Sequence, residues 1–448
     1  MSYRLKSPIR ANLEITESCN HTCVHCYNYW RYQETGILNS VDDMKLDIQH
    51  FLRIMDILIE QEIQSITLTG GEPFLRKDVL FPLVKKAKDA GLSVFINTNA
   101  TLITVDDAKI LKEMDLDGFL ISLLSGNKDT HNKMTHSNTH QKAISNIKML
   151  LEEGHYVSIN MVVSRDNYKE VRMTAKEMKN IGVHAFSATP MTSCYLSDTH
   201  ENIHLSPEQY KEVMYDLIWA MDNLNPMKIV VLDAIVHCMF DKEERRIFSP
   251  LLGDTYCCAG ISDCAISPTG DLRPCIMATD IGGNILKDGW DSAWKGVSRW
   301  REPSMIPTKC LDCSVVDSCG GGCRAAAKAT TGEYNGRDPY MLEPLEDRIT
   351  IKEYKEVKGK IIGYQDNIRF VDSVKTRKED FGGIFINDEN YLFLEKDAFD
   401  FIKDILKYNG SFTILDLIGK YDIKKEEVHD FFQVLLDEGY IVLEEGEK

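Results

Sequence analysis

The stretch CNHTCVHCYNYW at residues 19–30 places Cys19, Cys23 and Cys26 in a C-x3-C-x2-C spacing. It follows residues 11–16 (ANLEIT), whose alternation of apolar and polar residues predicts a β-strand. Three thiolates so close together can wrap one side of an iron–sulfur cube. Because four ligands would close a [4Fe–4S] cluster, three leave one iron open to chelate a small molecule and pass it an electron. The alternatives are three unrelated cysteines or a zinc knuckle completed by His21 or His25.

Composition narrows the class of protein. The chain has 448 residues, which suggests two or three domains, and its 43% hydrophobic and 27% charged residues predict a globular protein. A net charge of −17 argues against nucleic-acid binding and is compatible with a basic peptide partner. The N-terminus lacks the apolar core of a signal peptide, and no 18-residue window is free of charge. We therefore expect a cytoplasmic protein without a membrane partner, whose 13 cysteines hold metal clusters rather than disulfides.

Strand and helix patterns alternate along residues 1–235. The predicted strands are 11–16, 65–70, 92–98, 118–124, 156–163 and 184–190, with amphipathic helices such as 46–62 and 141–153 between them. This alternation predicts an α/β fold with a parallel sheet, and six units suggest a partial (β/α)6 barrel. Its site should lie at the carboxyl ends of the strands, where the first cysteine loop begins.

The rest of the chain divides into two further predicted domains. Residues 250–345 are rich in Gly, Pro, Asp and Cys and show little periodicity, so we expect metal clusters to hold them together. A charged linker at 346–365 leads to a regular domain at 366–446. Its strands are predicted near 367–373, 382–387 and 390–394, followed by three helices and a last strand near 440–444.

The C-x3-C-x2-C motif resembles that of the radical S-adenosylmethionine (SAM) enzymes, and a second motif strengthens the resemblance. Gly70-Gly71-Glu72-Pro73 ends the second predicted strand, where that family carries a GGEP motif that binds the amino group of SAM. Tyr27 stands where the family has an aromatic residue near the adenine. The resemblance implies that SAM occupies the open iron and is cleaved to a 5′-deoxyadenosyl radical, which is chemistry of the cofactor rather than of the protein.

Further SAM contacts follow from the same resemblance. Asn97 ends the third strand, Ser122 stands at the usual carboxylate contact, and Asn160 and Arg165 are candidates for the ribose and carboxylate. The chain departs from its best-known relatives by lacking an Asp at Leu124 and an Arg at Thr135, which puts the carry-over of their substrate contacts in doubt.

The second cysteine zone resembles the SPASM extension, which carries two auxiliary [4Fe–4S] clusters. The matching spacings are Cys310-x2-Cys313-x5-Cys319-x3-Cys323, Cys258-x5-Cys264 and Gly270-x4-Cys275. The family pattern assigns one cluster to Cys258 (or Cys257), Cys264, Cys275 and Cys323. It assigns the other to Cys310, Cys313, Cys319 and a later cysteine. That later cysteine is missing, so Asp338, Met341 or an open iron takes its place. Cys194 and Cys238 stand apart from both zones.

The C-terminal domain resembles the PqqD-like winged-helix chaperone of pyrroloquinoline quinone synthesis, a recognition element for ribosomally made precursor peptides (RiPPs). That module binds a leader peptide as an extra strand. The alternative is a small winged helix used in assembly or regulation. Acidic residues such as Glu395 and Asp397 disfavour a DNA-binding role.

Together these resemblances imply a radical SAM oxidoreductase that modifies a precursor peptide, with SAM, three [4Fe–4S] clusters and a reductant such as flavodoxin or ferredoxin. A thioether crosslink is the first expectation. The alternatives are carbon–carbon or carbon–oxygen crosslinking, formylglycine-type sulfatase maturation, and epimerisation with Cys194 as the catalytic hydrogen donor. A catalytically silent scaffold that keeps its clusters for structure is the alternative from another class.

Overall fold

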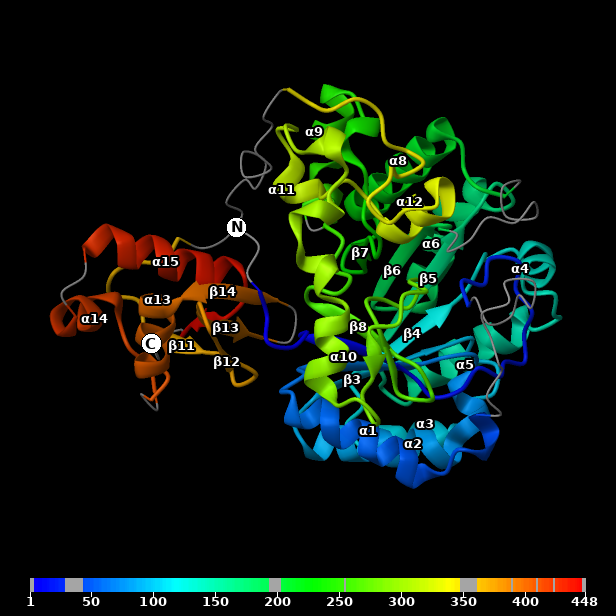
Figure 1. Ribbon diagram of the computed structural model, residues 1–448, viewed down its shortest axis with the longest axis horizontal. Helices are drawn as coiled ribbons and strands as arrows, with labels where there is room; N and C mark the ends of the chain where they lie inside the picture. The colour runs from blue at the N-terminus through cyan, green and yellow to red at the C-terminus, as the bar shows by residue number, and fades with distance from the viewer. Residues whose placement is uncertain are drawn as a thin grey trace. The chain divides into compact units, whose positions relative to one another are not determined.

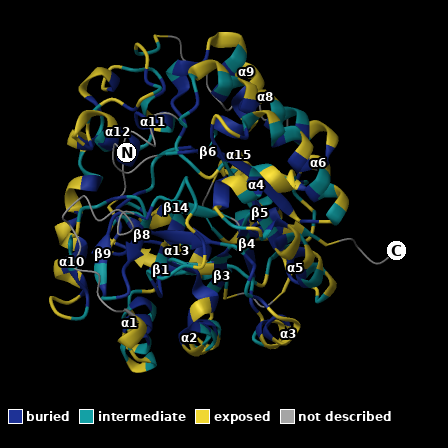
Figure 2. Cartoon of the chain, turned by 90° about the vertical axis from the view of Figure 1, so that its right-hand side faces the viewer, coloured by how far each residue is buried: buried dark blue, intermediate teal, exposed yellow. Residues whose placement is uncertain are grey.

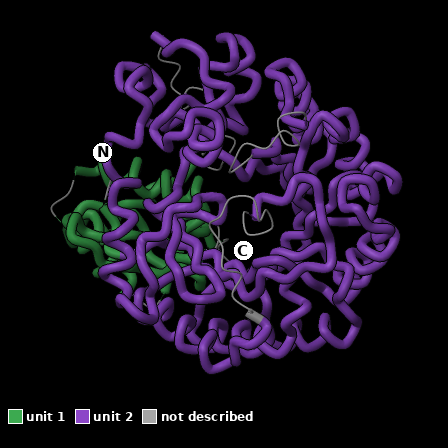
Figure 3. Tube along the Cα trace, turned by 45° about the vertical axis from the view of Figure 1, so that its right-hand side comes forward, with its two compact units in different colours: residues 1–6, 355–448 green, residues 7–354 purple. Residues whose placement is uncertain are grey.

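The computed structural model describes residues 4–28, 43–192, 203–253, 255–346, 361–387, 390–407, 410–421 and 424–444. The chain forms two compact units (Figure 3). One unit comprises residues 7–354, and the other comprises residues 1–6 with 355–448. Among the described residues, no helix is long and apolar enough to cross a membrane.

A ten-stranded sheet organises the larger unit, in the order β10-β9-β8-β1-β2-β3-β4-β5-β6-β7 (Figure 1). Strands β1 to β7 pair in parallel, as the alternating sequence pattern predicts. The strands are β1 (Arg10–Glu14), β2 (Ser65–Thr69), β3 (Ser93–Thr98), β4 (Gly118–Ser122), β5 (Val157–Val163), β6 (Ala185–Pro190), β7 (Lys228–Val230), β8 (Asp263–Ile266), β9 (Asp271–Arg273) and β10 (Gly283–Asn284).

Amphipathic helices between the strands bury their apolar faces against the sheet and expose the opposite faces (Figure 2). Helix α1, for example, buries Phe51, Ile54, Met55 and Leu58, and the Asp47 side chain caps its first turn. The helices are α1 (Ile48–Glu60), α2 (Lys77–Asp89), α3 (Val105–Glu113), α4 (Lys128–Thr135), α5 (His140–Glu152), α6 (Val171–Ile181), α8 (Pro207–Asn223), α9 (Lys242–Leu252), α10 (Trp290–Gly296), α11 (Val316–Cys319) and α12 (Arg324–Thr331).

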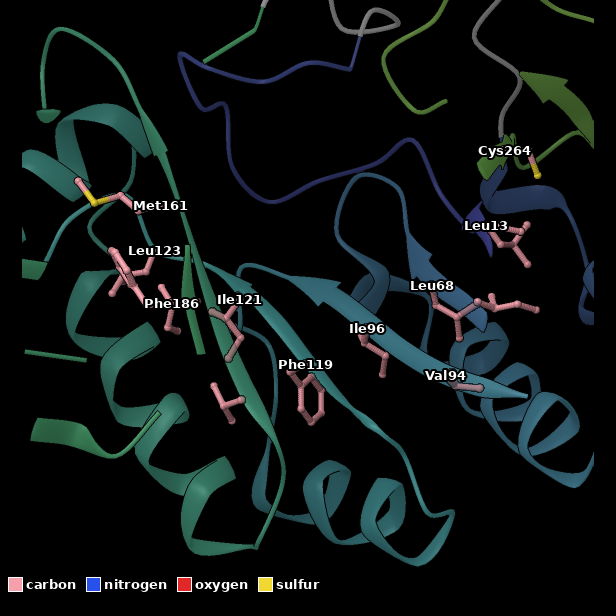
Figure 4. Packing of buried hydrophobic residues seen from close by; sticks show 14 of the residues in the cluster. Leu13, Leu68, Val94, Ile96, Phe119, Ile121, Leu123, Met161, Phe186 and Cys264 are labelled. Atoms are coloured by element: carbon pink, nitrogen blue, oxygen red, sulfur yellow. The ribbon is translucent and has the colours of Figure 1, made fainter. Parts of the chain in front are cut away.

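Strand periodicity separates the core from the face that can meet a ligand. Leu13, Leu68, Ile96 and Phe119 stand side by side in register on neighbouring strands, and all four are buried (Figure 4). Since successive side chains point to opposite faces of a sheet, the alternate positions face the other way. There the strands carry partly exposed residues, among them Asn97, so polar groups gather on that face.

The cysteine-rich segment continues the barrel's sheet instead of forming a separate body. β8 pairs in parallel with β1, and β9 then pairs with β8. On this side of β1, the Glu14 carboxylate forms an ion pair with Arg273 of β9, and both side chains are fully buried. Arg273 also donates to the carbonyls of Ile276 and Ala278 at 3.1 and 3.2 Å. The two domains expected at 1–235 and 250–345 therefore lie in one compact unit.

Among its described residues, the smaller unit has the predicted three helices and last strand, but four strands precede them instead of three, because β12 was not predicted. β12, β13 and β14 form an antiparallel sheet with β12 and β14 at its edges, and β11 pairs with β15. Phe385, Phe412, Phe432 and Tyr440 belong to its core. The elements are β11 (Ile368–Phe370), β12 (Lys375–Glu379), β13 (Gly382–Ile386), β14 (Tyr391–Glu395), α13 (Lys396–Ile405), α14 (Ile414–Lys420), α15 (Lys425–Asp437) and β15 (Ile441–Leu443).

The buried ion pair between β1 and β9 should dominate the stability of this junction. Arg273→Leu leaves the Glu14 carboxylate buried and uncompensated, so we expect it to lower the free energy of unfolding by about 3–5 kcal/mol. Arg10→Leu breaks the exposed pair with Asp263 on the neighbouring strands and should cost less than about 1 kcal/mol. Denaturant unfolding of both variants measures the difference, and equal losses would show that the buried pair has no special role.

Candidate functional site

The three cysteines of the first zone lie on the loop that leaves β1 at the carboxyl end of the parallel strands, as predicted. Cys19, Cys23 and Cys26 are each partly buried. Among the described side chains, no three Cys, His, Asp or Glu converge on one point as a single zinc ion would require. His21 faces Thr139 Oγ1 at 3.1 Å, on α5's side of the loop.

The two glycines of the second motif bring the end of β2 against the cysteine loop. The Gly71 amide donates to the Thr16 carbonyl at 2.6 Å. Gly70 has a φ of +136°, and a Cβ there would stand 2.2 Å from the Thr16 oxygen. A Cβ on Gly71 would stand 1.9 Å from the carbonyl oxygen of Ser18. Only glycine permits this approach, so the motif positions the loop that carries the cysteines.

The Glu72 side chain connects the end of β2 with the end of β3. Its carboxylate is buried and accepts hydrogen bonds from Thr98 Oγ1 at 2.7 Å, Asn99 N at 2.9 Å and Phe74 N at 3.1 Å. Burial raises its pKa to about 6, although these donors favour the charged form. The side chain thus braces the end of β3 against β2. Glu72 therefore has a positioning role within the protein, its contact with SAM stays a prediction, and Pro73 begins the short helix after it.

Four of the predicted SAM contacts lie on the polar face or the carboxyl ends of the strands. Asn97 stands near the end of β3, and Ser122 pairs in register with Asn160 of β5. The hydroxyls of Ser187 and Thr189 on β6 each donate to Asn160 Oδ1 at 2.9 Å. These bonds leave the amide N–H groups of Asn160 pointing outward. Arg165 lies just beyond β5, where it is exposed. The strand ends therefore bring together polar groups that are distant in sequence.

Tyr27 is partly buried beside the first two strands. Its hydroxyl bonds to the side chain of Thr69, the last residue of β2, and the Glu14 charge lies nearby. Desolvation, followed by the Glu14 charge, raises the pKa of Tyr27 well above its usual range, so the hydroxyl stays protonated. The aromatic residue next to Cys26 is thereby fixed at the strand ends.

Within the second zone, the structure groups Cys257, Cys275 and Cys323. Burial, followed by the nearby Cys257 thiolate charge, raises the pKa of Cys275 to about 12. Burial, followed by the same Cys257 charge, also raises the pKa of Cys323. Cys258 is the adjacent residue, and burial and Asp263 raise its pKa to about 11. Such thiols bind metal only by releasing their protons.

Cys264 does not join this group. It lies on β8, where it pairs in register with Ala11 of β1, and it is fully buried in the apolar core near Leu13 (Figure 4). Asp263, rather than another cysteine, is the charged group that acts on it. Its x5 spacing from Cys258 matches the family pattern, but strand alternation directs its side chain into the core. In this structure Cys264 packs in the core, and its ligand role stays a prediction.

Cys310, Cys313 and Cys319 form another group, as predicted. Cys310 and Cys319 belong to a buried cluster, and Cys313 packs against it. Asp338, one candidate for their missing partner, lies beside Cys323 instead. Its carboxylate accepts from the Cys323 amide at 2.9 Å and the Tyr340 amide at 3.0 Å. Asp338 is therefore held by the segment that bears Cys323.

A hollow that no sequence pattern predicted connects the end of β6 with this segment. Pro190 and Met191 line it from the strand, and Asp233, Cys323 and Asp338 line it from the other side. Burial and the Asp338 charge raise the pKa of Asp233 to about 7. The available signal was Asp233, a carboxylate that follows the apolar residues 229–232. Cys194, predicted as a hydrogen donor, lies outside the described residues.

Gly71→Ala should prevent the first loop from loading its cluster, because the added methyl collides with the backbone at Ser18. We expect iron after anaerobic reconstitution to fall by about four atoms, one [4Fe–4S] cluster, and SAM binding to be lost. Gly419→Ala is the control, since a Cβ there meets no neighbouring atom. Normal iron and SAM binding in Gly71→Ala would contradict the close approach.

Cys275 and Cys264 lie in different environments, so we expect opposite effects on iron content when each is replaced by Ala. Cys275→Ala should lower the iron content by up to about four atoms. Cys264→Ala should retain the iron and lose only packing energy in the core. Iron and acid-labile sulfide analysis of the two proteins checks this. Loss of iron from Cys264→Ala alone would show that the family spacing, rather than the observed grouping, identifies the ligand.

Comparison with known proteins gives the same picture. The Radical SAM superfamily model matches residues 13–178. The AdoMet-dependent heme synthase of Methanosarcina barkeri is 27% identical over 352 residues, covering 73% of this chain and 95% of that protein. Mycofactocin maturase MftC of Mycolicibacterium smegmatis is 27% identical over 348 residues, covering 76% and 84%. SuiB of Streptococcus suis, solved with its precursor peptide SuiA, shares the fold at 17% identity and a TM-score of 0.59, covering 75% and 76%. The chain therefore contains a radical SAM domain, and it is an enzyme similar to the radical SAM peptide maturases.

Proposed function

We propose that the protein modifies a ribosomally made precursor peptide by radical chemistry and that its product is a thioether crosslink. When bound, the first cluster and SAM supply the radical that takes hydrogen from the peptide. The chain's own residues position these groups. The glycine pair holds the cysteine loop, Glu72 braces the strand ends, and the polar residues on β3 to β5 face the reacting molecule.

The hollow between β6 and Cys323 is the observation that carries the proposal. It extends from the carboxyl end of a barrel strand, where the substrate must lie, to a thiol of the second zone. A thioether forms when a carbon loses a hydrogen atom and a substrate thiol loses its proton, which leaves one surplus electron. A cluster on Cys257, Cys275 and Cys323 would stand next to that hollow and could accept the electron.

The C-terminal unit supports a peptide as the substrate. Its three-stranded antiparallel sheet ends in β12 on one side and β14 on the other. Backbone groups on such edges bind extended peptides as an added strand. We propose that the leader of the precursor docks on this PqqD-like unit while its core reaches the barrel. SuiB has been solved with a precursor peptide bound, which is consistent with this class of partner.

A reaction on a heme precursor is the second candidate, because similarity to the heme synthase extends over 95% of that relative. It gives no role to the C-terminal unit. Carbon–carbon or carbon–oxygen crosslinking, epimerisation and formylglycine formation use the same first cluster and stay alternatives within the peptide class.

The experiment uses the full-length reconstituted protein with SAM, a reductant and the peptide encoded by a neighbouring short reading frame. We expect the peptide to lose about two hydrogens per crosslink and its cysteines to resist alkylation, as read by high-resolution mass spectrometry. Removing the leader should reduce the conversion. The triple variant Cys19→Ala, Cys23→Ala, Cys26→Ala is the inactive control.

Other results separate the alternatives. Solvent deuterium in a peptide of otherwise unchanged mass would overturn crosslinking in favour of epimerisation and would bring Cys194 forward as hydrogen donor. Oxidation of one Cys or Ser without a crosslink would favour formylglycine formation. Turnover of a heme precursor with an inert peptide would reject the peptide class altogether.

A further inference from the structure

We infer that Cys238 is the fourth ligand of a [4Fe–4S] cluster held by Cys310, Cys313 and Cys319. It takes the place of the later cysteine that the SPASM spacing leads one to expect. The inference rests on the auxiliary clusters of the proposed function and goes beyond it by identifying the ligand that closes one of them. Sequence spacing conceals Cys238, because it precedes the second zone and follows β7.

The four sulfurs share one hollow in the structure. Cys238, Cys310, Cys313 and Cys319 all line it, together with apolar side chains that include Val236 and Val315. Cys310 and Cys319 are only 8% and 6% exposed, and Cys238 and Cys313 pack against the same buried cluster. A hollow walled by four thiols and aliphatic groups, with Lys309 also on its wall, suits an iron–sulfur cluster, which needs four thiolates.

Two backbone segments position Cys238. It lies in the single 3-10 turn His237–Met239 between β7 and α9, a turn too short to move independently of its ends. The Cys319 thiol donates to the Ile235 carbonyl with a sulfur–oxygen distance of 3.6 Å, which ties the start of this segment to α11. On the other side, the Leu342 amide donates to the Cys238 sulfur at 3.2 Å.

Amide donors to sulfur are what a bound thiolate requires. Besides the bond to Cys238, the Leu345 amide donates to the Cys313 sulfur at 3.4 Å. Both donors come from the chain at 342–345, close to where the family places its last cysteine. In this protein that segment supplies N–H groups to the sulfurs in place of a ligand. Such hydrogen bonds stabilise thiolate charge and tune the reduction potential of a cluster.

Asp338 and Met341, the other two candidates for the fourth ligand, are less suitable than Cys238. Both carboxylate oxygens of Asp338 accept backbone amides, and the residue lines the hollow that contains Cys323. Met341 Sδ lies 3.9 Å from the Cys310 sulfur, where it accepts a contact from that thiol. A thioether is neutral and does not supply the fourth negative charge of a thiolate set. Cys238 therefore completes the site with the chemistry that the other three ligands share.

Closure by Cys238 has a functional consequence. When all four irons carry protein thiolates, no iron is open to a substrate thiolate. This cluster then transfers electrons only, and a cysteine of the substrate must meet iron elsewhere or react without it. The Cys238 thiol loses its proton on binding and needs no oxidant.

The test starts from full-length protein with Cys19, Cys23 and Cys26 replaced by Ala, which removes the first cluster and should leave about eight irons. Cys238→Ala is added to this parent, and Asp338→Asn and Met341→Leu are the matched rival variants. Iron and sulfide content and the electron paramagnetic resonance of the reduced proteins, with and without cyanide, are the readouts. We expect Cys238→Ala alone to lose up to about four irons or to gain a new cyanide-sensitive signal.

Cys238→Ser guards against misfolding, because a serine oxygen can still ligate iron. We expect it to retain the iron and to shift the potential of one cluster. The inference would be overturned if Cys238→Ser left the reduction potential unchanged, or if Cys238→Ala had the iron content and spectrum of its parent. It would also be overturned if Asp338→Asn, rather than Cys238→Ala, lost the iron. A parent that holds no iron would reject the auxiliary clusters themselves, which is a failure of the proposed function rather than of the ligand assignment.

Discussion

The pairing of β8 with β1 is the constraint on which the arrangement of this enzyme depends. It makes the cysteine-rich segment an extension of the barrel's own sheet, and the buried Glu14–Arg273 ion pair reinforces the junction. A buried charge pair is costly to break because the remaining partner stays desolvated. The first cysteine loop leaves β1 directly after Glu14, so the residue that anchors the extension also begins the segment that holds the first cluster.

The first site depends on backbone contacts more than on side chains that reach toward a ligand. The glycine pair at the end of β2 lets two loops touch, and the Glu72 carboxylate collects donors from the end of β3. Each of these contacts lies within the protein and fixes the ends of β2 and β3 relative to the cysteine loop.

The thiols of the second zone divide by environment rather than by spacing. The Cys257 charge acts on both Cys275 and Cys323, whereas Cys264 is a core residue on a strand. The Asp338 carboxylate lies beside Cys323, although the position of Asp338 in the chain suggested that it would lie beside Cys310. In a segment with little regular structure, contacts between distant loops decide which cysteines meet.

Residue patterns predicted the parallel α/β sheet, the first cysteine loop at the strand ends, the glycine motif and all elements of the C-terminal unit except β12. These features depend on local periodicity and on motifs whose residues are close in sequence. Only the tertiary structure decided that the Glu72 side chain faces inward, that Cys264 is buried in the core and that Cys238 lies beside Cys310. Each of these depends on which face of a strand or turn meets a partner far away in the chain, and spacing along the sequence does not carry that information.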